Sequence, residues 1–195
     1  MAPLAVAFLA CPAAAEPVTL DGVTFSDELG GVVLRGGHGV GTPSDPFVLY
    51  EDITDDGPAV LVVRGLASRL GAMPHGPAQV GFALRKVVTN RTARAWYGFE
   101  LELREALERP STYEDGLSFG QATAASRQFA SDRFRNVHLE DEPSDAVVFS
   151  DGAVPPGETV VVSFAVTDYT PVDRFYLLQR REAPSAALEP APHGG

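Results

Sequence analysis

The clearest pattern in this chain is an alternation of large apolar and smaller residues near its C-terminal end. It runs from residue 160 to 167, with large apolar side chains at every second position: Val160, Val162, Phe164 and Val166. A period of two is typical of a β-strand with one face on a core, whereas a helix would distribute these positions around its circumference. A turn of two prolines and a glycine, residues 155–157, precedes it. We therefore expect these four side chains to form one continuous core row.

A second alternating segment lies upstream and carries charge on one face. Its apolar residues, Phe99, Leu101 and Leu103, alternate with Glu100, Glu102 and Arg104. This pattern is typical of an antiparallel strand whose apolar face packs on the core while its polar face meets water. We expect the apolar residues to point inward, and Glu100 and Glu102 to point outward into solvent.

Shorter apolar runs bounded by turn residues predict the remaining strands. Together with the two above, the expected strands lie at residues 18–25, 32–34, 47–50, 59–63, 80–88, 96–104, 146–149, 160–167 and 175–178. The first is a short hairpin around Asp21-Gly22, and the continuously apolar run 59–63 indicates a strand covered on both faces. A turn at residues 89–92 predicts that the strands on either side of it pair as a hairpin. Residues 66–81 are expected to be irregular, because Pro74, Gly76 and Pro77 interrupt them.

Helical periodicity is almost absent. Residues 121–134, rich in alanine and serine, are the one segment that fits a short helix, and they fit a long loop equally well. Strands without alternating helices predict an all-β fold, an antiparallel β-sandwich of the immunoglobulin-like or jelly-roll kind. The length of 195 residues suits one domain, and 45% hydrophobic residues suffice for its core. We place the domain at residues 16–181 and expect the tail, 182–195, to be disordered.

The N-terminal residues have the pattern of an export signal. An apolar run at residues 4–10 is followed by three alanines at 13–15, a small-residue cleavage pattern before Glu16. Removal of residues 1–15 would also remove Cys11, the only cysteine, and leave a periplasmic or secreted chain without a disulfide. The alternative is a lipoprotein signal cut before Cys11. The run is too short to span a bilayer, so we expect no transmembrane segment in the mature chain.

The negative charge of the chain limits the classes of partner that we expect it to bind. Its formal net charge is −11 and its pI is about 4.7. Nucleic acids and anionic lipid headgroups both select basic surfaces, so we expect neither of them to bind. A protein or a glycan is the expected class of partner, with its identity unknown.

Two segments together resemble a known class of module. VTNRTARAWYGFELEL, followed later by VPPGETVVVSFAVTD, looks like bacterial extracellular immunoglobulin-like modules, with an Asn-containing turn, an aromatic-led strand and a Pro-Gly-Glu-Thr turn before an alternating strand. The resemblance covers about half of the chain, from Val80 to Leu178, and the long insert at residues 110–145 departs from it. It implies a cell-envelope or secreted setting and a role in binding or scaffolding, and it carries over no catalytic residue.

One short motif matches a hydrolase signature. Residues 116–120, GLSFG, fit G-x-S-x-G, in which the central serine, here Ser118, is the nucleophile on a sharp strand-to-helix turn. An acid and a base would have to be drawn from Asp132, Asp141, His138 and His193, and glycine-rich residues 36–41 would have to form an oxyanion loop. Residues 110–115 predict a loop rather than the buried strand that this motif needs. We therefore expect a turn that contains a serine, and we assign no catalytic residue.

Candidate metal ligands are scattered along the chain. The four histidines, His38, His75, His138 and His193, have no ligand spacing. Acidic residues crowd three loops, without the D-x-D-x-D-G spacing of a strong calcium motif: Glu140, Asp141, Glu142 and Asp145; Asp52, Asp55 and Asp56; Asp168 and Asp173. Calcium is therefore the one cofactor considered, and the alternative is solvated turns that keep the protein soluble.

Two further patterns have simple structural explanations. Five aromatic residues fit either a sugar-stacking platform or ordinary core packing: Trp96, Tyr97, Tyr113, Tyr169 and Tyr176. Asn90-Arg91-Thr92 is a glycosylation sequon, but asparagine is also favoured at turns because its side chain bonds nearby backbone groups.

These observations favour an exported, non-enzymatic β-sandwich that binds or scaffolds a partner in the bacterial envelope or outside the cell. Two alternatives stay open. One is a secreted hydrolase that uses Ser118, and the other is a calcium-stabilised adhesion or carbohydrate-binding module.

Overall fold

The fold consists of two β-sheets packed face to face, as the alternating segments predict. The computed structural model describes residues 16–69, 80–120 and 129–182. Its strands are β1 (Val18–Leu20), β2 (Val23–Ser26), β3 (Val32–His38), β4 (Phe47–Ile53), β5 (Ala59–Arg64), β6 (Val80–Asn90), β7 (Gly98–Arg104), β8 (Leu117–Ser118), β9 (Ala130–Ser131), β10 (Phe134–Glu140), β11 (Ala146–Gly152), β12 (Thr159–Asp168) and β13 (Arg174–Glu182). Two short 3₁₀ helices, η1 (Leu66–Arg69) and η2 (Tyr113–Asp115), accompany them.

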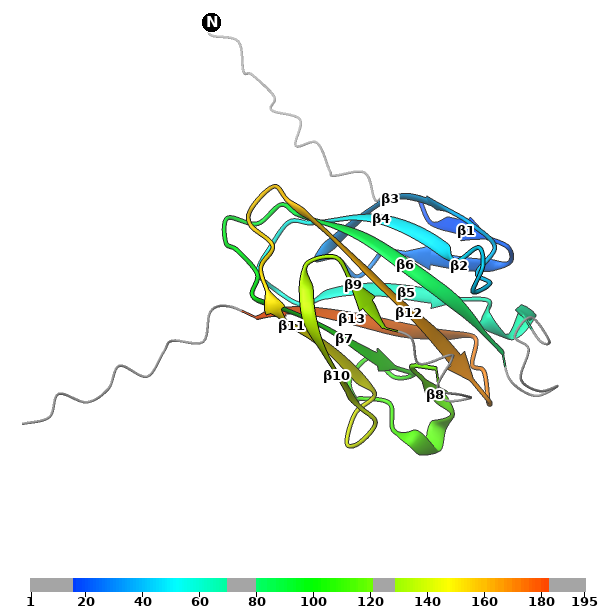
Figure 1. Ribbon diagram of the computed structural model, residues 1–195. Coiled ribbons are helices and arrows are strands. Elements are labelled where there is room, and N and C mark those ends of the chain that lie inside the picture. The colour runs from blue at the N-terminus through cyan, green and yellow to red at the C-terminus, as the bar shows by residue number, and fades with distance from the viewer. Residues whose placement is uncertain (1–15, 70–79, 121–128, 183–195) are drawn as a thin grey trace, which may run out of the picture.

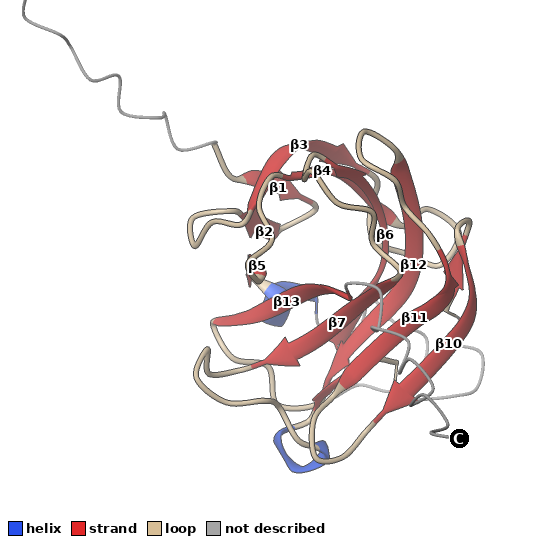
Figure 2. Ribbon diagram, turned by 90° about the vertical axis from the view of Figure 1, so that its left-hand side faces the viewer, coloured by secondary structure: helices blue, strands red, loops and turns tan. Residues whose placement is uncertain are grey.

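Each sheet combines strands that are distant in sequence (Figures 1 and 2). The first sheet has the order β1-β2-β5-β13-β7-β11-β10, and the second has the order β3-β4-β6-β12-β8, with β9 also paired to β12. The pairs are antiparallel except β4–β6, which is parallel. The prediction of an antiparallel β-sandwich is confirmed, with one parallel pair added to it.

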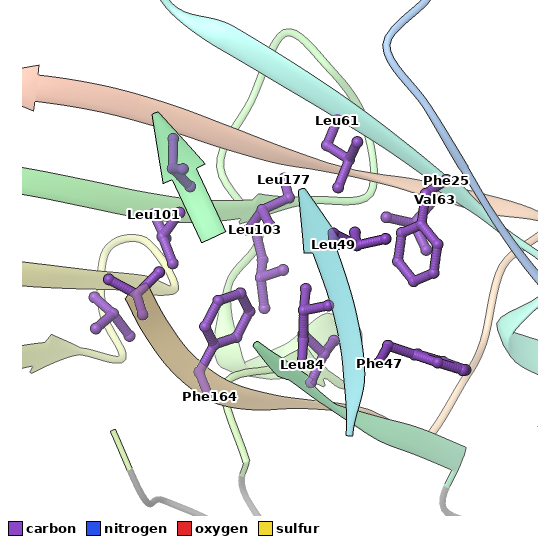
Figure 3. Close-up of a cluster of buried hydrophobic side chains, with 14 of the residues drawn as sticks. Phe25, Phe47, Leu49, Leu61, Val63, Leu84, Leu101, Leu103, Phe164 and Leu177 are labelled. Carbon is purple, nitrogen blue, oxygen red and sulfur yellow. The ribbon is translucent and has the colours of Figure 1, made fainter. Parts of the chain in front are cut away.

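The core lies between the two sheets and is built from the alternating rows. The side chains of Val160, Val162, Phe164 and Val166 are all at most 3% exposed, so the predicted core row of β12 is confirmed. The ring of Phe164 meets that of Phe119 edge-on at 5.5 Å. Leu101 and Leu103 of β7 and Leu177 of β13 lie on the opposite side of the core from Phe164, as Figure 3 shows.

The strand β5 is covered on both faces, as its continuous apolar run predicts. Leu61 and Val63 belong to the main core between the sheets. Val62 points the other way, into a second apolar cluster with Tyr176 and Leu178 on the outer face of the first sheet. Leu107, from the loop after β7, packs against this cluster.

The inward and outward positions of β7 are as predicted, but its outer face is not fully exposed to solvent. Phe99, Leu101 and Leu103 are completely buried toward the core. Glu100 is partly exposed, whereas Glu102 is only 3% exposed, so the prediction that Glu102 lies in solvent is wrong. Arg104 and Arg180 both pair with Glu102 and cover it, because long arginine side chains lie across the sheet.

The predicted hairpin between residues 80–88 and 96–104 is wrong. The strand β6 pairs with β4 and β12 in one sheet, while β7 pairs with β13 and β11 in the other. The turn after Asn90 therefore carries the chain across the sandwich. The two strands place their apolar faces against each other through the core instead of sharing an edge.

The hairpin at residues 18–25 is confirmed, with Leu20 paired to Val23 across a two-residue turn. Asp21 and Gly22 both have positive φ, 43° and 82°, which is the backbone that a tight hairpin turn needs.

The insert at residues 110–145 contains more sheet than the sequence indicated. It holds β8, β9 and β10, and β10 forms an edge strand paired with β11. Of the segment with helical potential, residues 121–128 lie outside the described part of the chain, and the rest contributes β9 and the start of β10. The segment 66–81, expected to be irregular, contributes η1 and the start of β6, and its residues 70–79 also lie outside the description.

Candidate functional site

A cavity of about 300 Å³ opens where β7 ends and the chain turns toward η2 and β8. We call it the acidic pocket, and it is lined by Glu105, Ala106, Arg109, Pro110, Ser111, Thr112, Glu114 and Asp115. Its lining includes three carboxylates and one guanidinium, so its charge is negative.

The first wall of the acidic pocket begins at the residue that follows β7. This residue, Glu105, is half-buried, and its Oε1 atom is completely buried. Ser111 fixes the backbone here, because its hydroxyl accepts from the Glu105 amide at 3.0 Å and its own amide donates to the Leu103 carbonyl at 3.1 Å. A tight turn, closed by a 3.1 Å bond from the Arg109 amide to the Ala106 carbonyl, joins the two.

The second wall is η2, which is held in place by Asp115. The Asp115 carboxylate accepts the backbone amides of Thr112 at 3.2 Å and Leu117 at 3.1 Å. Gly116, with φ of 87°, ends the turn and lets the chain enter β8. Leu117 then pairs with Asp168, which brings the end of β12 beside this wall.

Asp168 is a carboxylate that continues a core row. It follows Val166 by two positions in β12 and has no solvent exposure. One carboxylate oxygen, Oδ1, accepts the Thr170 amide at 2.8 Å, whereas the buried Oδ2 has no hydrogen-bond partner among the described residues. Burial raises the pKa of Asp168 to about 6; the Thr170 amide opposes the rise and the charge of Asp115 adds to it.

The pKa of Glu105 is raised as well, and the first cause is again burial. Burial raises the pKa of Glu105 to about 7, the charges of Asp115 and Asp168 add to the rise, and Arg109 opposes it. The Oε1 atom of Glu105 is buried and, within the described part of the chain, accepts no hydrogen bond. Each of the two carboxyl groups thus has one buried oxygen without the hydrogen bond that a buried charge needs.

Such an arrangement can be neutralised in two ways. It can bind protons near neutral pH, or it can accept a cationic group whose donors satisfy the free oxygens. Both responses differ from the behaviour of a solvated acidic loop, whose carboxylates stay hydrated and ionised at neutral pH.

The first response gives a pH prediction. Glu105 and Asp168 have pKa values above those of an unfolded chain, about 4.3 and 3.9, so the folded state holds protons that the unfolded state releases. Their contribution to stability is therefore present below about pH 4 and is lost as the pH rises through 6 to 7. We expect the melting temperature to be higher at pH 5.5 than at pH 8. Glu105→Gln should flatten this profile, and the exposed neighbour variant Glu108→Gln should not.

The structure places Ser118 in a setting unlike a nucleophile elbow. It lies in the strand β8, is completely buried, and donates its hydroxyl to Asp145 Oδ1 at 3.0 Å. Its φ is not positive, because Asp21 and Asp151 are the described non-glycine residues with that conformation. No histidine is among its partners in the described residues; His38 and His138 lie on β3 and β10, and His75 and His193 lie outside the description.

The other proposed triad members and acidic loops do not converge. Asp132 accepts the Val161 amide at 2.8 Å, and Asp52 pairs with Arg35 and Arg91. Asp168 approaches Asp115 and Glu105 rather than Asp173, with which the sequence groups it. Within residues 16–69, 80–120 and 129–182, no three acidic, histidine or cysteine side chains gather as a metal ion requires.

The aromatic residues also divide between core and surface. Trp96 is buried and stacks on Phe99 at 6.0 Å, and Tyr176 belongs to the outer apolar cluster. Tyr97 and Tyr169 are 47% and 45% exposed on separate segments, and the side chain of Tyr113 lies outside the description.

Comparison of the chain with protein-family models, with curated proteins and with solved structures found no match in any of the three. Among the described residues, no helix has the length and apolar character needed to cross a membrane.

Proposed function

We propose that this protein is an exported, non-enzymatic β-sandwich that binds a protein partner in the bacterial envelope or outside the cell. The acidic pocket is the contact site, and the partner supplies a basic side chain to it. The observation that carries the proposal is Glu105, a pocket-lining residue whose buried Oε1 accepts no hydrogen bond within the described residues, together with the buried Asp168 whose charge acts on Glu105 from behind the pocket wall.

The energetics of the pocket favour a cationic ligand. Burying a carboxylate without partners costs free energy, and the burial and mutual charges that raise the pKa of Glu105 report that cost. A guanidinium or ammonium group would recover part of it through charge-assisted hydrogen bonds. The cavity of about 300 Å³ has room for one such side chain. Arginine fits best, because its planar donors match carboxylates in pairs.

The export part of the proposal is supported by the sequence. Residues 1–15 have the pattern of a cleavable signal, and no cysteine follows Cys11. These residues lie outside the described part of the chain. An acidic protein with a pI of about 4.7 also suits a partner with a basic surface.

The test is a titration with single basic side chains. Amide spectra of the protein would be recorded by NMR while N-acetyl-arginine amide is added, with N-acetyl-norleucine amide as the uncharged control. We expect saturable shifts confined to residues 105–115 and 168–170, and weaker binding at pH 5.5 than at pH 8 because protons compete for Glu105. Glu105→Gln should weaken binding at least fivefold.

The matched control is Glu108→Gln, which removes the same charge from an exposed residue three positions along the chain. Equal weakening in both variants would mean that the probe responds to net charge alone. Shifts spread over the whole surface, or equal shifts with the norleucine probe, would contradict the acidic pocket as the binding site.

A further inference from the structure

A polar cluster lies in the middle of the apolar core, far in sequence from the acidic pocket. Lys86 of β6, Glu51 of β4 and Gln179 of β13 each occupy an inward position in a row of apolar residues. All three are at most 1% exposed, and Lys86 is the only lysine of the chain. The cluster joins both sheets, because β4 and β6 belong to one sheet and β13 to the other.

The three side chains meet at one carboxyl group. The Nζ atom of Lys86 donates to Glu51 Oε1, and Gln179 Nε2 donates to Glu51 Oε2 at 3.0 Å. The carboxyl of Glu51 therefore holds an amine on one oxygen and a carboxamide on the other. The remaining atom of the carboxamide, Gln179 Oε1, is buried and has no hydrogen-bond partner among the described residues.

The dry surroundings change the chemistry of the amine. Burial lowers the pKa of Lys86, although Glu51 opposes this through its charge and its hydrogen bond. A buried ion pair is costly, and transfer of one proton from Lys86 to Glu51 turns it into two neutral groups. The amine that results is a nucleophile, since its nitrogen then carries a free electron pair.

The same proton transfer allows a second orientation of the Gln179 carboxamide. The oxygen and nitrogen of a carboxamide exchange places when the group turns over. A protonated Glu51 would then donate to Gln179 Oε1, which satisfies that oxygen and polarises the carbonyl. This state holds a neutral amine and a polarised carbonyl on the two oxygens of one carboxyl group, with water excluded.

We propose that Lys86 and Gln179 join in an isopeptide bond inside the folded core. The Nζ atom of Lys86 attacks Cδ of Gln179, and the Cδ–Nε2 bond breaks. Glu51 transfers protons from the attacking amine to the departing nitrogen, which leaves as ammonia. One amide replaces another, so no oxidant, reductant or cofactor is consumed. The bond would tie β6 of one sheet to β13 of the other.

The test is mass spectrometry of the purified, folded protein. We expect the intact mass to be lower than the sequence mass by one ammonia. Trypsin cuts after arginine but not after a modified lysine, so peptides 86–91 and 175–180 should be recovered as one linked species. A sequence mass, with peptides 87–91 and 175–180 recovered separately because trypsin also cuts after a free lysine, would overturn the proposal. A loss of one water, with Lys86 linked to Glu51, would overturn the assignment to Gln179.

Variants then assign the role of each residue. Lys86→Met should abolish the linked species, and Glu51→Gln should reduce it at least tenfold, because glutamine cannot transfer the proton. Glu105→Gln, a matched loss of a carboxylate at the acidic pocket, should form the linked species normally. Linked peptides at wild-type level in folded Glu51→Gln would remove Glu51 from the mechanism. If that variant does not fold, peptide mapping of the wild-type protein still decides whether the bond exists.

Discussion

Phe164→Ala is expected to lower the free energy of unfolding by about 3–5 kcal/mol, because it leaves a cavity that the two sheets cannot close. Phe164 is 3% exposed and sits at the centre of the β12 row, where its ring meets Phe119 edge-on at 5.5 Å. The loss combines the transfer of the ring to water with the lost contacts of the residues around it. It is a large part of the roughly 5–15 kcal/mol that stabilises an ordinary domain.

The matched control is Ser163→Ala on the opposite face of the same strand. Ser163 is half-buried, and among the described residues its hydroxyl accepts a single long contact of 3.5 Å, from Arg85, so the change should cost under about 0.5 kcal/mol. Urea unfolding of both variants, with the dependence on denaturant measured for each, separates the two effects. Equal losses would contradict the assignment of inner and outer faces in β12.

The inner faces of β7 and β12 could be predicted from the sequence, but beyond the hairpin of β1 and β2 the neighbours of the strands could not. Alternation identifies which residues of β12 and β7 point inward, because the period of two is a property of one strand alone. It carries no information on the partner, which is why the pairing of β6 with β7 was wrong. The edge strand β10 escaped prediction for a related reason: residues 135–138 are all exposed, so no apolar face marks them.

Burial on the outer face depends on groups that are distant in sequence. Glu102 has the pattern of a solvent-facing residue, yet Arg180 reaches it from β13, 78 residues away. No local pattern encodes such a contact, because it needs the register between β7 and β13, where Glu102 lies opposite Leu178.

The acidic pocket was missed, although a signal for it exists. Asp168 occupies the next inward position after Val166 in β12, and Glu105 follows Leu103 by two positions, just beyond the end of β7. Extending each alternation by one step identifies a carboxylate near a core end. The sequence could not show that the two ends meet, since this follows from the pairing of Asp168 with Leu117. Grouping acidic residues by proximity in sequence, as with Asp173, therefore selected the wrong neighbours.

The same reasoning identifies the inward polar residues of the core cluster. Lys86, Glu51 and Gln179 each interrupt an apolar row at an inner position. An interruption of this kind predicts that a polar partner faces it across the core, because a buried polar group without one is unstable. The core cluster interrupts inner rows of apolar residues, and the carboxylates near the acidic pocket follow such rows. Interrupted alternation is therefore the most informative signal in this chain.

Asn90→Ala is expected to lower the free energy of unfolding by about 2–4 kcal/mol, because it leaves several buried backbone groups without partners. Asn90 is completely buried at the end of β6, where the chain crosses between the sheets. Its Nδ2 donates to the carbonyls of Arg94 at 2.7 Å and Val154 at 2.8 Å, and its Oδ1 accepts the Thr92 amide at 2.9 Å.

The network around Asn90 also explains the sequon that contains it. Both bonds from Nδ2, the atom to which a glycan would be attached, are directed into the protein, so the folded chain presents no acceptor there. Thr92 completes the network, with its hydroxyl donating to Asn90 Oδ1 at 2.7 Å and accepting from Trp96 Nε1 at 3.2 Å. Asn90 thus holds the segment that connects the two sheets, both by its bonds to backbone groups and, by way of Thr92, by a link to Trp96.

The chain offers a matched control in its other asparagine, Asn136, which is exposed on the edge strand β10. Asn136→Ala should change stability by under about 0.5 kcal/mol. Asn90→Asp is the sharper variant, because it keeps the size of the side chain but replaces two donated hydrogen bonds with repulsion between oxygens. Thermal and urea unfolding of the three variants should rank Asn90→Asp at or below Asn90→Ala, with Asn136→Ala at wild-type stability. A wild-type value for Asn90→Asp would show that the crossing does not depend on these donors.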